Sequence, residues 1–98
     1  MPFVLDFTDS ALDDLAFFKK YEQALILDQV EVQLSYQPLN ETRNRKPLEL
    51  NALGEWELRV GMYRIFYDVD AEQIAVKIKA VGYKQHNKLY LRGKEYAL

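Results

Sequence analysis

The sequence contains no cysteine and only one histidine, His86. It therefore lacks the thiolates for a disulfide framework and the clustered ligands for a structural zinc site, so we expect no metal. No apolar run approaches the ~18 residues that a membrane-spanning helix needs. The first residues also lack the charged and apolar regions of a secretory signal peptide. These absences predict a cytoplasmic protein that does not enter a membrane.

The length of 98 residues predicts one domain, residues 1–98, and an apolar content of 49% suffices for one small core. The formal net charge is −2, but it is unevenly distributed. Residues 1–42 hold two basic and eight acidic side chains, whereas residues 43–98 hold eleven basic and seven acidic ones. This asymmetry fits either an anionic partner for the second part of the chain or an ordinary solvated surface.

Residues 55–82 predict three consecutive antiparallel strands, because apolar and polar residues alternate through this stretch with a period of two. Gly61 and the polar segment 68–73 favour the two turns. In the third strand we expect Ala80 on the buried face and Val81 on the opposite one. That opposite face is the place to look for function, and it carries five charged residues: Glu57, Arg59, Arg64, Lys77 and Lys79.

The first part of the chain predicts a strand and two helices. Apolar residues alternate over residues 2–7, and N-cap residue types then precede an apolar stripe that indicates a helix over residues 9–20. A second stripe predicts another helix, which ends before Pro38. We expect no secondary structure in residues 39–53, while residues 83–98 fit either a short helix or an extended segment.

This order of elements predicts an α+β fold, in which the N-terminal strand and a helical hairpin pack on a small, mainly antiparallel four-stranded sheet. A position beside the strand at residues 56–60 would suit the N-terminal strand. The sequence alone leaves that placement open.

Several residues could carry chemistry. Arg64 beside Phe66 can bind a phosphate while a base stacks nearby, or it can pair with Glu57 or Asp68 across the sheet. His86 is suited to proton transfer at neutral pH, although a lone exposed histidine is more often inert. Two lysines and a tyrosine flank it and could stabilise an anion or stack on a base: Lys84, Lys88 and Tyr90. The loop before the sheet adds three further basic residues that could grip phosphate: Arg43, Arg45 and Lys46.

The residues WELRVGMYRIFYDVD, followed by IAVKIKAVGYKQHNKLY, resemble the RelE/ParE superfamily of type II toxins, and ETRNRKPLELNALGEW resembles the loop of one bacterial subgroup. The resemblance covers nearly the whole chain. Its core pattern is G-x-Y-R-[IV]-x-Y-x-[IV] and then A-V-G, here at Gly61, Tyr63, Arg64, Ile65, Tyr67, Val69 and residues 80–82.

The resemblance implies a RelE-like toxin that enters the ribosome and cleaves mRNA without a metal or another cofactor, through attack of the RNA 2′-hydroxyl on the adjacent phosphate. It also implies a cognate antitoxin, bound in a hetero-oligomer. Matching positions assign Arg64 to the scissile phosphate, Lys84 to the pentavalent intermediate, and His86 or Tyr90 to proton transfer. RNA contacts would come from six further residues: Arg43, Arg45, Lys46, Lys77, Lys79 and Lys88.

The sequence also departs from the RelE-like pattern. Glu55 and Glu57 stand where RelE-type enzymes carry lysines, and Lys46 precedes the Pro-Leu pair where one subclass carries a glutamate base. Two alternatives therefore remain. One is a ParE-like toxin that lacks the nuclease and inhibits DNA gyrase, and the other is an attenuated member that mainly binds its antitoxin.

Overall fold

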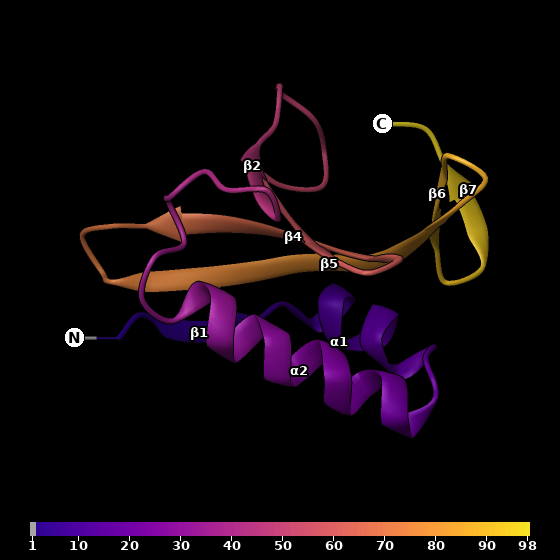
Figure 1. Ribbon diagram of the computed structural model, residues 1–98, viewed down its shortest axis with the longest axis horizontal. Coiled ribbons are helices and arrows are strands. Elements are labelled where there is room, and N and C mark those ends of the chain that lie inside the picture. The colour runs from indigo at the N-terminus through magenta and orange to yellow at the C-terminus, as the bar shows by residue number, and fades with distance from the viewer. Residues whose placement is uncertain (1) are drawn as a thin grey trace.

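The computed structural model describes residues 2–98 and has an α+β architecture, as the sequence predicts. The helices α1 and α2 lie together on one face of the sheet, and the strands β6 and β7 stand at its far end (Figure 1). In chain order the elements are β1 (Val4–Phe7), α1 (Asp9–Ala16), α2 (Lys20–Leu34), β2 (Arg45–Pro47), β3 (Trp56–Val60), β4 (Tyr63–Asp70), β5 (Ala75–Gln85), β6 (Lys88–Leu91) and β7 (Lys94–Tyr96).

The sheet has seven strands rather than the expected four, and six of them follow the path β2-β3-β4-β5-β6-β7. The placement of β1, which the sequence left open, is not the suggested one beside β3: β1 pairs in parallel with β5, from Val4 opposite Ala75 to Phe7 opposite Ile78. The physical reason is that β2 already occupies the free edge of β3. This strand is short and includes Pro47, which an edge strand tolerates, so its sequence carries little strand signal.

Both helices begin at local signals, but α1 ends at Ala16 rather than at the expected residue 20, because Lys20 is already the first residue of α2. The Thr8 hydroxyl accepts a hydrogen bond from the Ala11 N–H at 3.0 Å and caps α1. At the start of α2, the Glu22 carboxylate accepts from the Lys19 N–H at 3.1 Å, one half of a capping box. The helix ends at Leu34, before Pro38, as predicted.

The main core lies between the helices and the sheet. Ile26 and Val30 of α2 pack there against the buried strand residues Ile65, Tyr67 and Ile78. A second, smaller cluster lies on the opposite face of the sheet and is formed by Leu53, Phe66, Ala80 and Leu89. Part of the face that the alternation pattern left to solvent is therefore covered by residues 48–54 and the C-terminal strands.

An irregularity in β5 reverses the expected orientation of Ala80 and Val81. Phe66 lies opposite Ala80 while Tyr67 lies opposite Ile78, so Lys79 is an extra residue with no partner in the pairing. The bulge shifts the alternation by one position. Val81 consequently enters the helix-side core, and Ala80 packs in the smaller cluster on the other face.

The C-terminal segment, which the sequence left open, is extended and forms two antiparallel pairings, β5 with β6 and β6 with β7. Each turn holds two residues at positive φ: His86 and Asn87 at 53° and 64°, then Arg92 and Gly93 at 50° and 78°. Two consecutive positive φ angles are the mark of tight two-residue hairpin turns. Over residues 2–98, no helix is both long and apolar enough to cross a membrane.

Candidate functional site

The hairpin of β3 and β4 aligns charged residues on the sheet face away from the helices. Its turn places Arg59 directly opposite Arg64, and Glu57 opposite Phe66. On the other side of β3, Lys46 lies opposite Glu57. Residues directly opposite one another in a sheet share a face, so two arginines, a lysine and a glutamate meet there.

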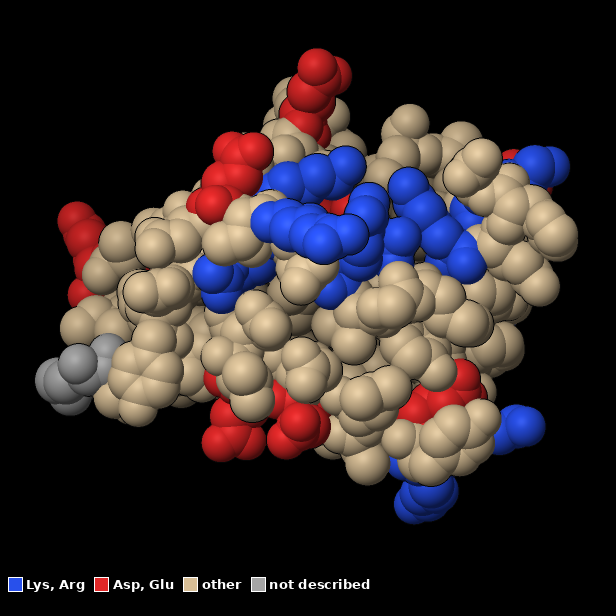
Figure 2. All heavy atoms as spheres, in the orientation of Figure 1, with Lys and Arg blue, Asp and Glu red and all other residues tan. Residues whose placement is uncertain are grey.

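Lys84 joins the same face from β5. Arg64 pairs with Gly82, and Lys84 follows two positions later, on the same side of the strand. We call the four basic residues Lys46, Arg59, Arg64 and Lys84, together with Glu57, the cationic cluster. In Figure 2, Lys and Arg side chains gather across the upper middle of the molecule, on the side away from the helices, and Asp and Glu lie mostly around the margin.

Arg64 is the most deeply held cation of the cluster, with a side chain only 9% exposed. Its Nη1 donates to the carbonyl oxygens of Gly61 at 2.7 Å and Tyr63 at 2.9 Å, which clamps the hairpin turn. Its Nε is buried and has no hydrogen-bond partner within residues 2–98. Burial lowers the pKa of Arg64, the Glu57 carboxylate raises it, and the Arg59 charge lowers it further. The guanidinium stays charged, because its ordinary pKa is so high.

Glu57 lies between two of these cations. Its Oε1 is 4.0 Å from the Arg64 Nε and 3.9 Å from the Lys46 Nζ. The pairing of Arg64 with Glu57, which the sequence offered as an alternative to a phosphate contact, is therefore present. The free protein shows a partly neutralised cluster whose more exposed members, Lys46 and Arg59, face solvent.

The structure does not bring Tyr90 to the cationic cluster. Tyr90 lies opposite Tyr83 on the helix side of the sheet, and the two rings stack with centroids 5.3 Å apart. Lys84 instead lies opposite Leu89. His86 is exposed in the turn that follows β5, two residues beyond Lys84. Because Lys84 lies opposite Leu89 and Tyr90 is the next residue of β6, the side chains of Lys84 and Tyr90 face opposite sides of the sheet.

The six residues expected to contact RNA are also dispersed. Lys46 belongs to the cluster, and Arg43 is exposed in the loop before it. Arg45 is buried and on the helix side: its Nη1 donates to the Gln33 carbonyl at 2.6 Å, and its Nε to the Asn40 carbonyl at 3.0 Å. Arg45 thus joins the end of α2 to the loop and is not available at the surface.

The remaining three basic residues lie beside acids. Lys79 forms an ion pair with Asp68 at 3.3 Å, and Lys77 is the residue opposite Asp68 in the pairing of β4 with β5. Lys88 pairs with Glu95 at 3.6 Å. These partners offset the charge that each lysine could offer to a phosphate.

Arg59 is a member of the cluster that the sequence analysis did not assign to the site. A signal for it existed. Once the hairpin turn is placed at Gly61 and Met62, the register puts Arg59 opposite Arg64. Two like charges directly opposite are unfavourable for a sheet, so this pair points to a function rather than to stability.

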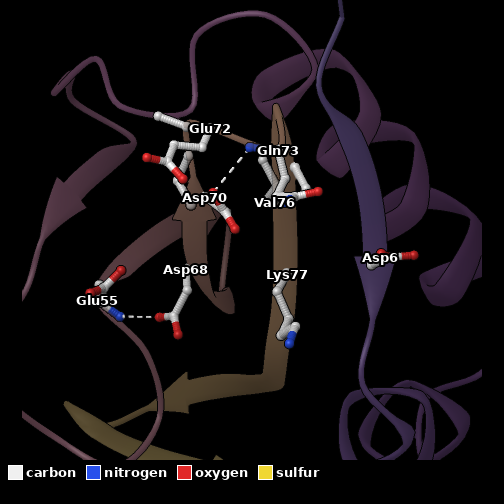
Figure 3. Close-up of a pocket in the computed structure, with 11 residues that line it drawn as sticks. Asp6, Glu55, Asp68, Asp70, Glu72, Gln73, Val76 and Lys77 are labelled. Carbon is white, nitrogen blue, oxygen red and sulfur yellow. Dashed lines mark hydrogen bonds between the residues drawn. The ribbon is translucent and has the colours of Figure 1, made fainter.

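A cleft of about 620 Å³ lies at the other end of β4 and β5 (Figure 3). Its acidic lining residues include Asp68, Asp70 and Glu72, and Lys77 is its one basic lining residue. Such a lining repels phosphate. Within residues 2–98 no group of acidic residues or histidine is arranged to hold a metal ion. The cationic cluster is therefore the better candidate site.

The protein is therefore a small α+β domain with a helical hairpin on one face of its sheet and basic residues gathered on the other. Residues 5–87 match the family described as the ParE toxin of the type II toxin–antitoxin system, parDE. The chain belongs to this family, within the RelE/ParE superfamily of type II toxin–antitoxin toxins.

Solved structures agree with this membership. The toxin–antitoxin complex RelBE2 from Mycobacterium tuberculosis contains a chain that is 31% identical over 86% of this chain and 93% of its own length, with a TM-score of 0.75. A chain of the RelE–RelB complex from Pyrococcus horikoshii is 17% identical over 88% and 99%, with a TM-score of 0.68, and shows the shared fold. A comparison with curated proteins gave no match.

Proposed function

We propose that this protein is the toxin of a type II toxin–antitoxin pair that cleaves mRNA on the ribosome. The observation that carries the proposal is the convergence of four basic residues on one open face of the sheet. A phosphodiester undergoing attack gains negative charge, and fixed cations stabilise that charge.

The reaction needs no group beyond RNA and protein side chains. The 2′-hydroxyl of the substrate gives up its proton as its oxygen forms a bond to the adjacent phosphorus. The bond from phosphorus to the 5′-oxygen breaks, which leaves a 2′,3′-cyclic phosphate, and the 5′-oxygen receives a proton. Arg64, held by two carbonyls, orients the phosphate, while Lys84 stabilises the pentavalent intermediate. Lys46 and Arg59 contact the flanking backbone. Because Tyr90 lies on the helix side of the sheet, away from the cationic cluster, we assign proton transfer to His86.

We also propose a cognate antitoxin as the partner of this chain. The structural relatives from Mycobacterium tuberculosis and Pyrococcus horikoshii were solved as complexes of toxin with antitoxin. On α2, Leu27 and Val32 are 42% and 62% exposed, so the helix offers apolar side chains outside the core. Apolar anchors of this kind are what a partner helix or extended segment uses.

A second candidate function is inhibition of DNA gyrase, because the description of the matching family names the ParE toxin. The two functions differ in whether they need the cationic cluster. The nuclease needs it for chemistry, whereas a toxin that binds a protein target needs no charged contact to a scissile phosphate. The pairing of Glu57 with Arg64 is compatible with either reading.

One experiment separates these functions. Expression of the chain alone should stop incorporation of labelled methionine before that of labelled thymidine. Primer extension on translating mRNA should then reveal new 5′ ends that depend on ribosomes. Early loss of thymidine incorporation with intact mRNA would favour gyrase. Absence of any growth arrest, with a stable antitoxin complex, would support the attenuated family member.

A further inference from the structure

The Glu57 carboxylate has an unusual environment for an acidic residue. It is 3% exposed, and it lies between Lys46 of β2 and Arg64 of β4 at 3.9 and 4.0 Å. No hydrogen bond among residues 2–98 reaches its side-chain oxygens, whereas a direct contact would measure ~2.7–3.2 Å. The attraction of Glu57 for both cations is therefore Coulombic, without the directional bonds that would lock a salt bridge.

The two cations keep unused capacity as a result. Among the side-chain nitrogens and oxygens of residues 2–98 that are completely shielded from solvent, the Arg64 Nε is the one that lacks a hydrogen-bond partner. The Lys46 side chain is half exposed and can turn toward a ligand at the surface. A phosphate oxygen, like a carboxylate oxygen, is a negatively charged acceptor for the N–H groups of arginine and lysine. The groups that Glu57 attracts are thus the groups that would bind a phosphodiester.

We propose that Glu57 is an internal counter-ion, which stands between Lys46 and Arg64 in the place of a phosphodiester and sets the affinity of the cationic cluster for phosphate groups. The inference rests on the proposed function for the natural ligand, the mRNA backbone. Glu57 is then a specificity-determining residue. Free polyanions must compete with it, while a phosphate held against the cluster by the ribosome does so at a high effective concentration.

The test uses inorganic phosphate, so it does not depend on RNA cleavage. Phosphate is titrated into the full-length chain at constant ionic strength, and the Arg64 Nε–H resonance, assigned with Arg64→Lys, reports binding. Glu57→Gln keeps the shape of the side chain and removes its charge. One charge removed ~4 Å from the site should tighten phosphate binding about tenfold or more. Glu55→Gln is the matched control, because Glu55 is exposed and precedes the same strand.

The control should change the affinity less than about twofold, since exposed charges are screened by salt. Equal effects of Glu55→Gln and Glu57→Gln, or weaker binding by Glu57→Gln, would overturn the proposal. If thermal melts show that Glu57→Gln does not fold, the Glu57→Asp variant replaces it in the test. Its shorter side chain withdraws the carboxylate from Arg64 and should tighten phosphate binding by a smaller factor. Unchanged phosphate binding by Glu57→Asp would overturn the proposal.

The outcomes also separate this inference from the nuclease. If the wild type never cleaves mRNA on ribosomes but Glu57→Gln binds phosphate more tightly, the counter-ion proposal is supported and the nuclease proposal is rejected. If the wild type cleaves mRNA and Glu57→Gln leaves phosphate binding unchanged, only the counter-ion proposal is rejected.

Discussion

Asp14 and Arg92 form an ion pair in which the Asp14 Oδ1 is 2.8 Å from the Arg92 Nε. The other oxygen of the Asp14 carboxylate accepts a hydrogen bond from the Val81 N–H at 3.0 Å. One buried carboxylate on α1 therefore joins the helix to β5, just beyond the bulge, and to the turn between β6 and β7. This contact anchors the C-terminal strands from the helix side of the sheet.

We predict that Asp14→Ala lowers the stability of the protein. The change leaves the buried Val81 N–H without an acceptor, which costs ~1–3 kcal/mol. In a domain of this size the melting temperature should fall by about 5 °C or more. Asp13→Ala is the matched control, because Asp13 is the exposed neighbour on the same helix. Equal melting temperatures for the two variants would show that the carboxylate does not anchor the strands.

The same carboxylate predicts a dependence of stability on pH. Burial is the largest influence and raises the pKa of Asp14 above its ordinary value of 3.8, although the Val81 N–H and Arg92 lower it. The folded state then binds the proton more tightly than the unfolded state. The contribution of Asp14 is therefore greatest below pH 3.8 and declines as the pH rises through the raised folded pKa.

Urea unfolding of the wild type and Asp14→Asn across this range measures the effect. The asparagine keeps an acceptor for the Val81 N–H and does not titrate. The stability of the wild type relative to Asp14→Asn should fall as the pH rises from ~3 to ~6. A difference that increases over this range would mean that Arg92 and the Val81 N–H outweigh the burial of Asp14.

The elements that could be predicted are those with local signals. The meander of β3, β4 and β5 follows from alternation and from Gly61, and both helices follow from caps and apolar stripes. The position of β1 beside β5 could not be predicted, because parallel pairing joins residues far apart in sequence. The bulge at Lys79 leaves no signature either, yet it decides which of Ala80 and Val81 enters the main core.

The site shows the same division between local and long-range information. The register of a two-residue hairpin brings Arg59, Glu57 and Arg64 together and can be worked out from residues 56–67. The burial of Arg45 depends on the carbonyls of Gln33 and Asn40, which lie outside its own strand. Tyr90 faces away from Lys84 because of the register of the hairpin between β5 and β6. The sequence of residues 83–98 did not predict this hairpin.

We predict that Arg64→Ala reduces both cleavage and stability. The side chain clamps the turn through two carbonyls and balances the buried Glu57. Removal of one partner of a buried ion pair costs about 3 kcal/mol or more. Loss of toxicity in this variant alone is therefore no proof of a catalytic role. Thermal melting should show the destabilisation, and an unchanged melting temperature would mean that the clamp does not support the fold.

Lys84→Ala offers the cleaner test of catalysis, since its side chain is only partly buried. Loss of a donor to the developing charge typically lowers the rate ~10²–10³-fold. We expect a loss of this size in ribosome-dependent cleavage, with little change in the melting temperature. Lys20→Ala, at the start of α2, removes the same charge on the helix side and should cleave like the wild type. Equal losses in both variants would point to net charge rather than to a role of Lys84.

His86 and Tyr90 should differ in their effect on the reaction, because they lie on different parts of the fold. His86 is exposed at the end of the strand that carries Lys84, whereas Tyr90 stacks on Tyr83 on the helix side. A general acid or base contributes ~10²–10⁴ in rate, so His86→Gln should slow single-turnover cleavage by a factor in that range. Tyr90→Phe keeps the stacked ring and should leave the rate unchanged. If Tyr90→Phe instead slows cleavage while His86→Gln does not, the proton passes through the phenol, and the C-terminal strands must move on the ribosome to bring Tyr90 to the substrate.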